Sequence, residues 1–345
     1  MKDIGKPGKV QRMKRKGLGG IVCACLLALS CWGCAGDEKN QAEELRVGVL
    51  LYNQDDLFIG ALKQEIDGCF RETEKREGCR ITVSYFDSMG NQITQNEQID
   101  TFIEQGYDVL CVNLVVRTDA AAIVDKGKKA DVPLVFFNRE PVSADLERWE
   151  KIYYVGTDAE EGGRKQGEIF LDYCRARKSA DKNGDGVIQY VLLEGEPGHQ
   201  DSAIRTESCI KSIEEGGVEL ERLAVANANW RRSQGKEKMA GWLDEFGSGI
   251  EAVISNNDAM ALGALDALAE SDLAELSPVV IGLDGIEEAR AAVRDGRMAG
   301  TVVNDARGQA EAIVALATEL GKDEIPDIPD MKDRIIRVPH KTVTQ

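Results

Sequence analysis

Clusters of carboxylate, amide and imidazole side chains follow several apolar segments of this 345-residue chain. Residues of this kind stand at Asp56, Asn138, His199, Asp201, Asn257, Asp284 and Asn304. A sugar hydroxyl both donates and accepts a hydrogen bond, so a carbohydrate site needs carboxylate acceptors beside nitrogen donors. Phe58 and Trp230, each in a polar loop before a helical stretch, could supply aromatic faces for the apolar side of a sugar ring. The combination predicts a site for a polyhydroxylated ligand.

Each of these residues also has an ordinary structural explanation. An Asp or Asn before a helix is more often an N-cap than a ligand, and a lone Phe58 is more often part of the core. Trp230 is ambiguous, because it lies among polar residues. The binding hypothesis therefore rests on the repetition of polar strand ends, not on any single residue.

A second motif has the spacing of a calcium loop. Oxygen-bearing side chains occupy positions 1, 3, 5 and 9 of the segment 181–189, at Asp181, Asn183, Asp185 and Gln189, and Val187 at position 7 can offer its carbonyl oxygen. These are the first nine positions of an EF-hand loop. Position 12 is Leu192, where a bidentate Glu is needed, so the loop is incomplete by itself. An Asp/Asn/Gly-rich surface turn is the alternative.

Alternating strand and helix patterns must position these groups. Apolar strands are expected at 45–52, 80–86, 109–114 and 132–137, with helices at 58–67, about 91–105 and about 118–130. The rhythm restarts with strands at about 152–156, 187–193, 221–225, 251–255, 278–282 and 299–303. Continuous apolar strands between amphipathic helices predict an α/β protein with parallel sheets covered on both faces.

The restart predicts two doubly wound parallel-sheet lobes, with ligands at the carboxyl ends of the strands. No long Pro- or Ser-rich linker separates them, so we expect a hinge of three short crossings near 155–156, 303–304 and 338–339. The expected lobes are 45–155 plus 305–337 and 156–304 plus 338–345.

The N-terminus is expected to lie outside the fold. Residues 1–33 carry a charge of about +6, and an apolar run at 18–30 precedes Cys31 and Cys34. A basic segment followed by a short apolar run is typical of an export signal. The segment resembles a bacterial lipoprotein signal with Cys34 as the acylated residue, Cys31 being the alternative, and 34–44 as a tether. We expect an extracytoplasmic protein anchored to the membrane surface by lipid; a buried Cys-rich helix is the competing interpretation.

Composition narrows the function classes further. With 43 Lys+Arg against 60 Asp+Glu, the chain has a formal charge of −17, or about −23 without the leader. This balance argues against a nucleic-acid partner, because phosphate binding needs clustered basic residues. The five cysteines beyond the leader show no metal-ligand or C-x-x-C spacing, which favours small buried residues, with a Cys69–Cys79 bridge left open.

The segments 55–58, 135–141, 153–158, 192–199, 255–260 and 301–305 resemble the bacterial galactose/glucose-binding proteins, the periplasmic-type solute receptors of ABC sugar importers. The resemblance runs from about residue 46 to 339. It implies that hydrogen bonds to the hexose come from Asp56, Asn138, His199, Asp201, Arg205, Asn257, Asp284 and Asn304. It also implies that Phe58 and Trp230 sandwich the ring, that Asp56 accepts either C4 epimer, and that Glu251 completes a structural calcium site. Leu57, beside Asp56, departs from the family pattern.

The expected function is capture of galactose or glucose by hinge closure and delivery to an ABC permease and its ATPase. We expect a monomer. Presentation of sugar to a membrane sensor or chemoreceptor, or binding of another monosaccharide, is the alternative. An enzyme using Asp56 and Asp284 as a carboxylate pair is disfavoured, because the chain has two His and no nucleophile or phosphate-cradling motif. A sugar-responsive transcription regulator is disfavoured by the export signal and the acidic charge.

Overall fold

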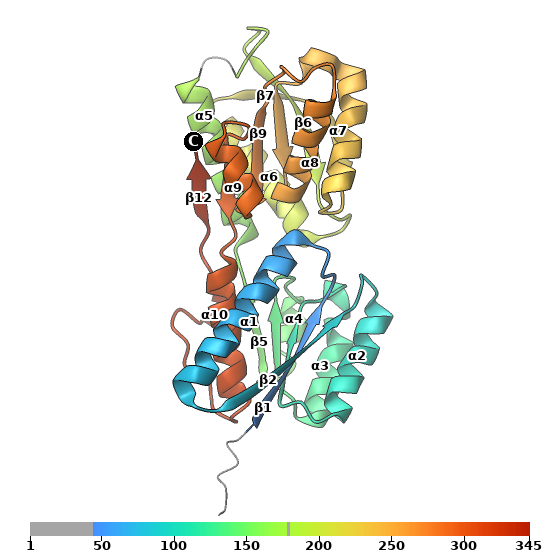
Figure 1. Cartoon of the computed structure of the whole chain (residues 1–345), viewed down its shortest axis with the longest axis vertical. Helices are drawn as coiled ribbons and strands as arrows, with labels where there is room; N and C mark the ends of the chain where they lie inside the picture. Colours follow the sequence, from blue (N-terminus) through green and yellow to red (C-terminus); the bar gives the residue numbers. More distant parts are fainter. Residues whose placement is uncertain (1–43, 178–179) are drawn as a thin grey trace, which may run out of the picture. The chain divides into compact units, whose positions relative to one another are not determined.

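The computed structural model describes residues 44–177 and 180–345, which form two six-stranded sheets with helices on both faces (Figure 1). We call the sheets, with the helices packed on them, the first and second lobes. The leader and the expected lipidation residue Cys34 lie outside the described residues.

The first lobe has the strand order β11-β5-β4-β3-β1-β2, and all neighbouring strands in it are parallel. Helix α10 joins this lobe by packing on α1 and on the central strands. Its elements are β1 (Glu44–Leu51), α1 (Leu57–Glu77), β2 (Arg80–Asp87), α2 (Gln92–Glu104), β3 (Val109–Val112), η1 (Arg117–Asp119), α3 (Ala120–Ala130), β4 (Leu134–Phe137), α4 (Ser143–Leu146), β5 (Ile152–Gly156), α10 (Ala306–Leu320) and β11 (Ile335–Arg337).

The second lobe repeats this pattern with the order β12-β10-β9-β8-β6-β7. Its elements are α5 (Ala159–Ala176), β6 (Val187–Glu194), α6 (Gln200–Glu215), β7 (Glu219–Asn227), α7 (Arg232–Phe246), η2 (Gly247–Gly249), β8 (Ala252–Ser255), α8 (Asp258–Glu270), β9 (Val279–Asp284), α9 (Glu287–Arg294), β10 (Gly300–Val303) and β12 (Lys341–Thr344).

The predicted fold class, two doubly wound α/β lobes joined by three crossings, is confirmed. The chain passes from one lobe to the other after β5, after β10 and between β11 and β12. One strand departs from the parallel prediction, because β12 pairs antiparallel with β10. The four-residue strand β12 enters this sheet from the first lobe with no helix before it, and doubly wound sheets often carry an antiparallel strand at their edge.

Helix α1 is longer than its apolar pattern predicted. The pattern ends near Asp67, but the helix continues through a polar segment to Glu77 and ends where Gly78 adopts φ +68°, a left-handed conformation that glycine reaches at low cost. The second half still buries Cys69 and Phe70 against the core.

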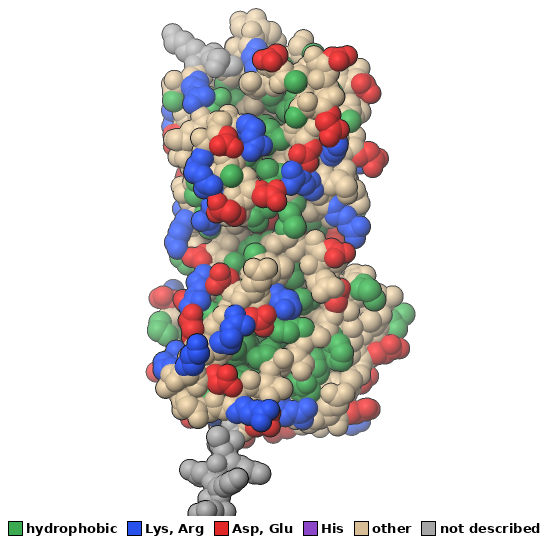
Figure 2. All heavy atoms as spheres, viewed as in Figure 1, with side chains coloured by type: hydrophobic (Ala, Val, Ile, Leu, Met, Phe, Trp, Pro, Cys, Tyr) green, Lys and Arg blue, Asp and Glu red, His purple; other side chains and the backbone are tan. Residues whose placement is uncertain are grey.

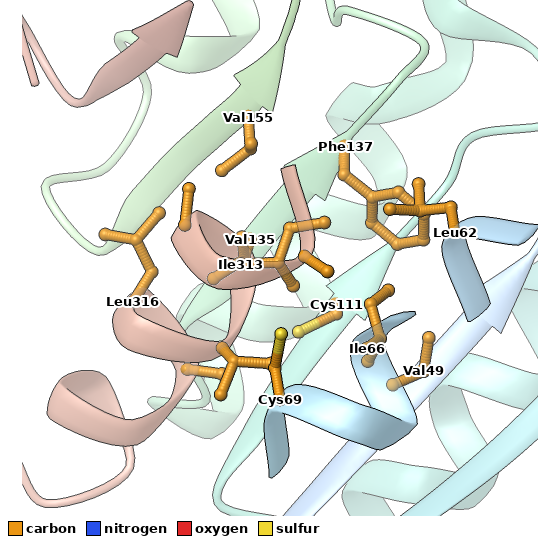
Figure 3. Packing of buried hydrophobic residues seen from close by; sticks show 14 of the residues in the cluster. Val49, Leu62, Ile66, Cys69, Cys111, Val135, Phe137, Val155, Ile313 and Leu316 are labelled. Carbon is orange, nitrogen blue, oxygen red and sulfur yellow. The ribbon is translucent and has the colours of Figure 1, made fainter. Parts of the chain in front are cut away.

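Buried aliphatic and aromatic side chains hold each sheet to its helices. In the first lobe, Leu62 and Ile66 of α1 and Ile313 and Leu316 of α10 pack over the strands beneath them (Figure 3). A separate cluster lies on the other face of the sheet, under α2 and α3. In the second lobe, two further clusters pack the helices against the two faces of its sheet. Coverage of both faces is what leaves the strand ends as the place for polar function.

The visible surface carries acidic and basic side chains interspersed (Figure 2). None of the helices in the described ranges is both long and apolar enough to cross a bilayer.

Candidate functional site

One cavity is lined by all ten residues that the sequence predicted for the sugar site. They lie at the carboxyl ends of strands, or in the loops and first two helical turns that follow, in both lobes: Asp56, Phe58 and Asn138 in the first, and His199, Asp201, Arg205, Trp230, Asn257, Asp284 and Asn304 in the second. Their roles in binding stay predictions, but their convergence follows from the topology, since parallel strands of one sheet end at a common edge.

Asp56 shows that the N-cap explanation and the ligand hypothesis are compatible. Its Oδ1 accepts the backbone N–H of Ile59 at 3.0 Å, which caps α1. Its Oδ2 accepts the hydroxyl of Tyr52 at 2.6 Å. A carboxylate has about four lone-pair sites, so two contacts leave capacity for ligand hydroxyls. The cap places Phe58, buried, in the first turn of α1.

In the second lobe, the start of α6 contributes three side chains. His199 stands at the N-cap position, and Asp201 and Arg205 follow on the first two turns. The His199 ring meets the Trp230 ring edge-on at 5.1 Å between centroids, and the Arg205 guanidinium lies 5.9 Å from the same indole. These contacts fix the orientation of Trp230 from one side.

Three of the predicted residues have positive φ although none is glycine. Asn138 has φ +61°, Trp230 φ +63° and Asp284 φ +126°. Asn tolerates the left-handed region well, but for Trp and Asp such conformations cost about 1–3 kcal/mol each. Backbone strain of this kind concentrates at functional sites, which supports a functional role for this cavity.

Burial alters the protonation of the ionisable groups in the cavity. Desolvation raises the pKa of Asp284 well above its ordinary value, against the opposing effect of Arg205. Desolvation also raises the pKa of Asp201. Desolvation, together with Arg139 and Arg205, lowers the pKa of His199, so its imidazole is neutral near pH 7 and can donate from one nitrogen and accept at the other.

Two buried nitrogen atoms of cavity residues find no hydrogen-bond partner within the described protein. They are Nδ1 of His199 and Nε of Arg205. Leaving a buried polar group without a hydrogen bond costs about 1–3 kcal/mol. A ligand rich in oxygen atoms would satisfy these groups.

Three residues outside the predicted set of contacts also line the cavity: Tyr52, Ile59 and Arg139. Arg139 belongs to the polar strand-end cluster 138–140 that follows β4, but the sequence assigned a sugar contact only to Asn138 of that cluster. Tyr52 stands in no polar cluster, and an aromatic residue at the end of an apolar strand is normally predicted to lie in the core.

The segment 181–189 folds around the carboxylate of Glu251. Both oxygens of this buried side chain accept backbone N–H groups of the loop, from Lys182 at 2.6 Å, Asn183 at 3.1 Å and Gln189 at 3.1 Å. Asp185 Oδ2 lies 2.9 Å from the Asn183 amide nitrogen and 3.1 Å from that of Gln189. The side chains of Asn183, Asp185 and Gln189 therefore lie together, and Glu251 holds the loop through its backbone N–H groups. Oxygen-bearing side chains of this kind are the ligands that calcium prefers. The described ranges contain no cluster of three or more His, Cys, Asp or Glu side chains placed to hold a metal, so the calcium site stays a prediction.

The five cysteines of the described ranges are free thiols, and no Cys69–Cys79 bridge forms. Cys69, Cys111 and Cys209 are buried, as the packing interpretation predicted, whereas Cys79 and Cys174 are partly exposed. Desolvation raises the pKa of Cys111 to about 12, so this thiol is unreactive at neutral pH.

Two doubly wound lobes with a polar cavity between them define a solute-binding protein. A family model described as the periplasmic binding protein domain matches residues 47–324, and the chain belongs to this family. Family membership places it outside the cytoplasm and makes it a binding protein, not an enzyme.

Particular relatives extend over nearly the whole fold. The chain is 37% identical over 303 residues to the D-galactose/methyl-galactoside binding periplasmic protein MglB of Haemophilus influenzae, covering 87% of this chain and 89% of that protein. It is 29% identical to the ribose import binding protein RbsB of Bacillus subtilis, covering 88% of each. Among solved structures, an ABC transporter solute binding protein of Bacillus halodurans with bound myo-inositol matches with a TM-score of 0.73 and 26% identity, covering 88% of this chain and 96% of that one.

Proposed function

We propose that this protein captures D-galactose or D-glucose in the cavity between its lobes and delivers the sugar to an ABC importer. At the coarser level, the chain is a sugar-binding component of ABC transporters. The observation that carries the finer proposal is the convergence of eight polar and two aromatic residues of the predicted types on one cavity, from both lobes.

The chemistry of the cavity suits a pyranose. Carboxylates at Asp56, Asp201 and Asp284 can accept from hydroxyls, while the unpartnered nitrogens of His199 and Arg205 can donate to oxygen atoms. Phe58 and Trp230 offer aromatic faces for the C–H surfaces of a ring. Because the groups belong to different lobes, a sugar would contact all of them only in the closed form, and this differential affinity would drive closure.

Galactose is favoured by the relative named as a galactose-binding protein, which shares 37% of its sequence with this chain. The other similar proteins are named for ribose or carry myo-inositol, so relationship alone does not choose the sugar. The predicted role of Asp56 at the C4 hydroxyl supports galactose and glucose together.

Isothermal titration calorimetry of the leaderless protein with galactose, glucose, ribose, arabinose and myo-inositol tests the proposal. We expect micromolar or tighter binding of at least one hexose and binding at least about 100-fold weaker for the two pentoses, because lost hydroxyls leave buried groups unpaired. Millimolar or absent binding of both hexoses would refute it. Deleting the gene should abolish hexose uptake if transport, not presentation to a sensor, is the task.

The proposal includes a structural calcium site and a lipid anchor. Calcium would be held by Asp181, Asn183, Asp185, Gln189 and Glu251 side chains with the carbonyl of Val187, and would tie the loop to the strand that Glu251 precedes. Its role would be structural. The lipid anchor at Cys34 would keep the binding domain at the membrane surface, near a permease.

A further inference from the structure

An ion pair joins the two lobes beside the sugar cavity. Arg139 follows β4 in the first lobe, and Glu196 follows β6 in the second. Arg139 Nη2 lies 2.9 Å from Glu196 Oε2, and the side chains are 7% and 33% exposed. The geometry is not that of an aligned hydrogen bond, so the attraction is mainly between charges. Because its members belong to different lobes, a hinge opening that separates the lobes would break this pair.

The first lobe holds Arg139 in place independently of Glu196. Its Nη1 donates to the carbonyl of Val115 at 2.7 Å. The guanidinium stacks over the ring of Tyr52, with 3.7 Å from Cζ to the ring centroid. A planar guanidinium over a buried ring is a favourable cation–π contact.

Tyr52 connects the Arg139 guanidinium to Asp56, a predicted sugar-binding residue. Its hydroxyl donates to Asp56 Oδ2 at 2.6 Å. Desolvation and the neighbouring Asp56 raise the pKa of the phenol, so the hydroxyl stays protonated and remains a donor. The other oxygen of Asp56 is held by the N–H of Ile59. The Asp56 carboxylate thus has one orientation, set partly by a ring that lies under the interlobe arginine.

We propose that the Arg139–Glu196 pair is a latch that slows sugar release by stabilising the closed lobes, and that Tyr52 is the positioning residue that couples this latch to Asp56. The proposal rests on the function proposed above. Glu196 lines a neighbouring pocket, which shares Asp56 and Trp230 with the sugar cavity, but it does not line the cavity that holds the ten predicted residues. Substituting it therefore tests the latch without removing a predicted sugar contact.

Stopped-flow measurement of sugar association and dissociation with E196Q tests the latch. We expect the dissociation rate to rise about threefold to tenfold while the association rate changes less than twofold, because a partly exposed pair that forms on closure acts on release. Added salt should speed dissociation from the unmodified protein and have little effect on E196Q. The matched control is E288Q, since Glu288 pairs with Arg232 within the second lobe; it should leave both rates unchanged.

The Y52F variant, which keeps the ring under Arg139 and removes the donor to Asp56, tests the coupling. We expect affinity to fall about tenfold with a changed galactose-to-glucose ratio, whereas a merely structural defect would weaken both sugars equally. In the Y52F background, E196Q should have a smaller effect than alone. An unchanged dissociation rate in E196Q would overturn the latch, and additive effects in the double variant would overturn its coupling to Asp56. Both outcomes are compatible with hexose binding by the unmodified protein. Absence of hexose binding by the unmodified protein would overturn the proposed function and this inference with it.

Discussion

At the scale of single residues, burial decides how the cavity carboxylates behave. Asp284 ends β9 with a strained backbone and lies buried between the lobes. Desolvation raises the pKa of Asp284, and the nearby Asp258 and Asp56 raise it further. Asp284 therefore ionises at a higher pH than an ordinary Asp does. A sugar hydroxyl would stabilise the ionised form, because a carboxylate is the better acceptor.

Sugar affinity should therefore depend on pH. Since the raised pKa of Asp284 leaves its side chain protonated as the pH falls, affinity should rise with pH and decline on acidification at a pH well above 3.8, the ordinary pKa of Asp. D284N should bind about 100-fold more weakly and lose most of this pH dependence. Calorimetry at stepped pH values measures both. A D284N protein with the same acid-side decline as the unmodified protein would show that another group is responsible.

At the scale of elements, the turn after β6 needs a small residue at Gly195, because the Trp230 ring packs directly against it. A Cβ built on Gly195 would lie 2.0 Å from Trp230 Cζ2, and no real Cβ contact is that close. The G195A substitution should displace the indole and lower hexose affinity at least about tenfold, although Gly195 is not itself a predicted contact; the free energy of unfolding should fall by about 1–3 kcal/mol.

The control for this prediction is G241A in α7, where an added Cβ meets no atom within 4 Å. That substitution should leave binding unchanged and stabilise the helix by up to about 1 kcal/mol. Calorimetric titration and urea unfolding measure the two effects. Equal hexose affinity in G195A and the unmodified protein would mean that Trp230 can move without loss.

The calcium loop is also an element-scale feature. Removing calcium with a chelator should lower the thermal unfolding midpoint of the leaderless protein by about 5 °C, and readdition should restore it, because a ligand bound only by the folded state stabilises it. E251Q should unfold at a lower temperature and no longer respond to calcium. The control E219Q, on the exposed first residue of β7, should respond normally. A midpoint that calcium does not shift in the unmodified protein would exclude the site.

At the scale of the whole molecule, the leader predicts where the protein works. Metabolic labelling with a fatty-acid analogue should label the full-length chain and not C34A, while C31A keeps the label. The physical reason is that acyl chains, and not a spanning helix, would hold the domain at the membrane. Label lost from C31A and kept by C34A would move the anchor to the alternative residue.

Much of the architecture could be predicted because it depends on local patterns. Periodicity located most strands to within a few residues, and the repeated order of elements implied two lobes with polar strand ends. Strands β11 and β12 escaped prediction, because their pairing with β5 and β10 joins residues far apart in the chain. The polar end of α1 escaped prediction because its burial depends on α10.

The sequence by itself determined the fold class, because the alternation of apolar and polar residues carries that information along the chain. The ten residues that line the cavity were implied by the resemblance of short segments to the galactose/glucose-binding proteins. Only the tertiary structure decided that Asp56 is both a cap and a cavity residue, that Tyr52 and Arg139 join it, and that Arg139 meets Glu196 across the lobes. Those contacts depend on distances between segments that are remote in the chain, and no local pattern records such distances.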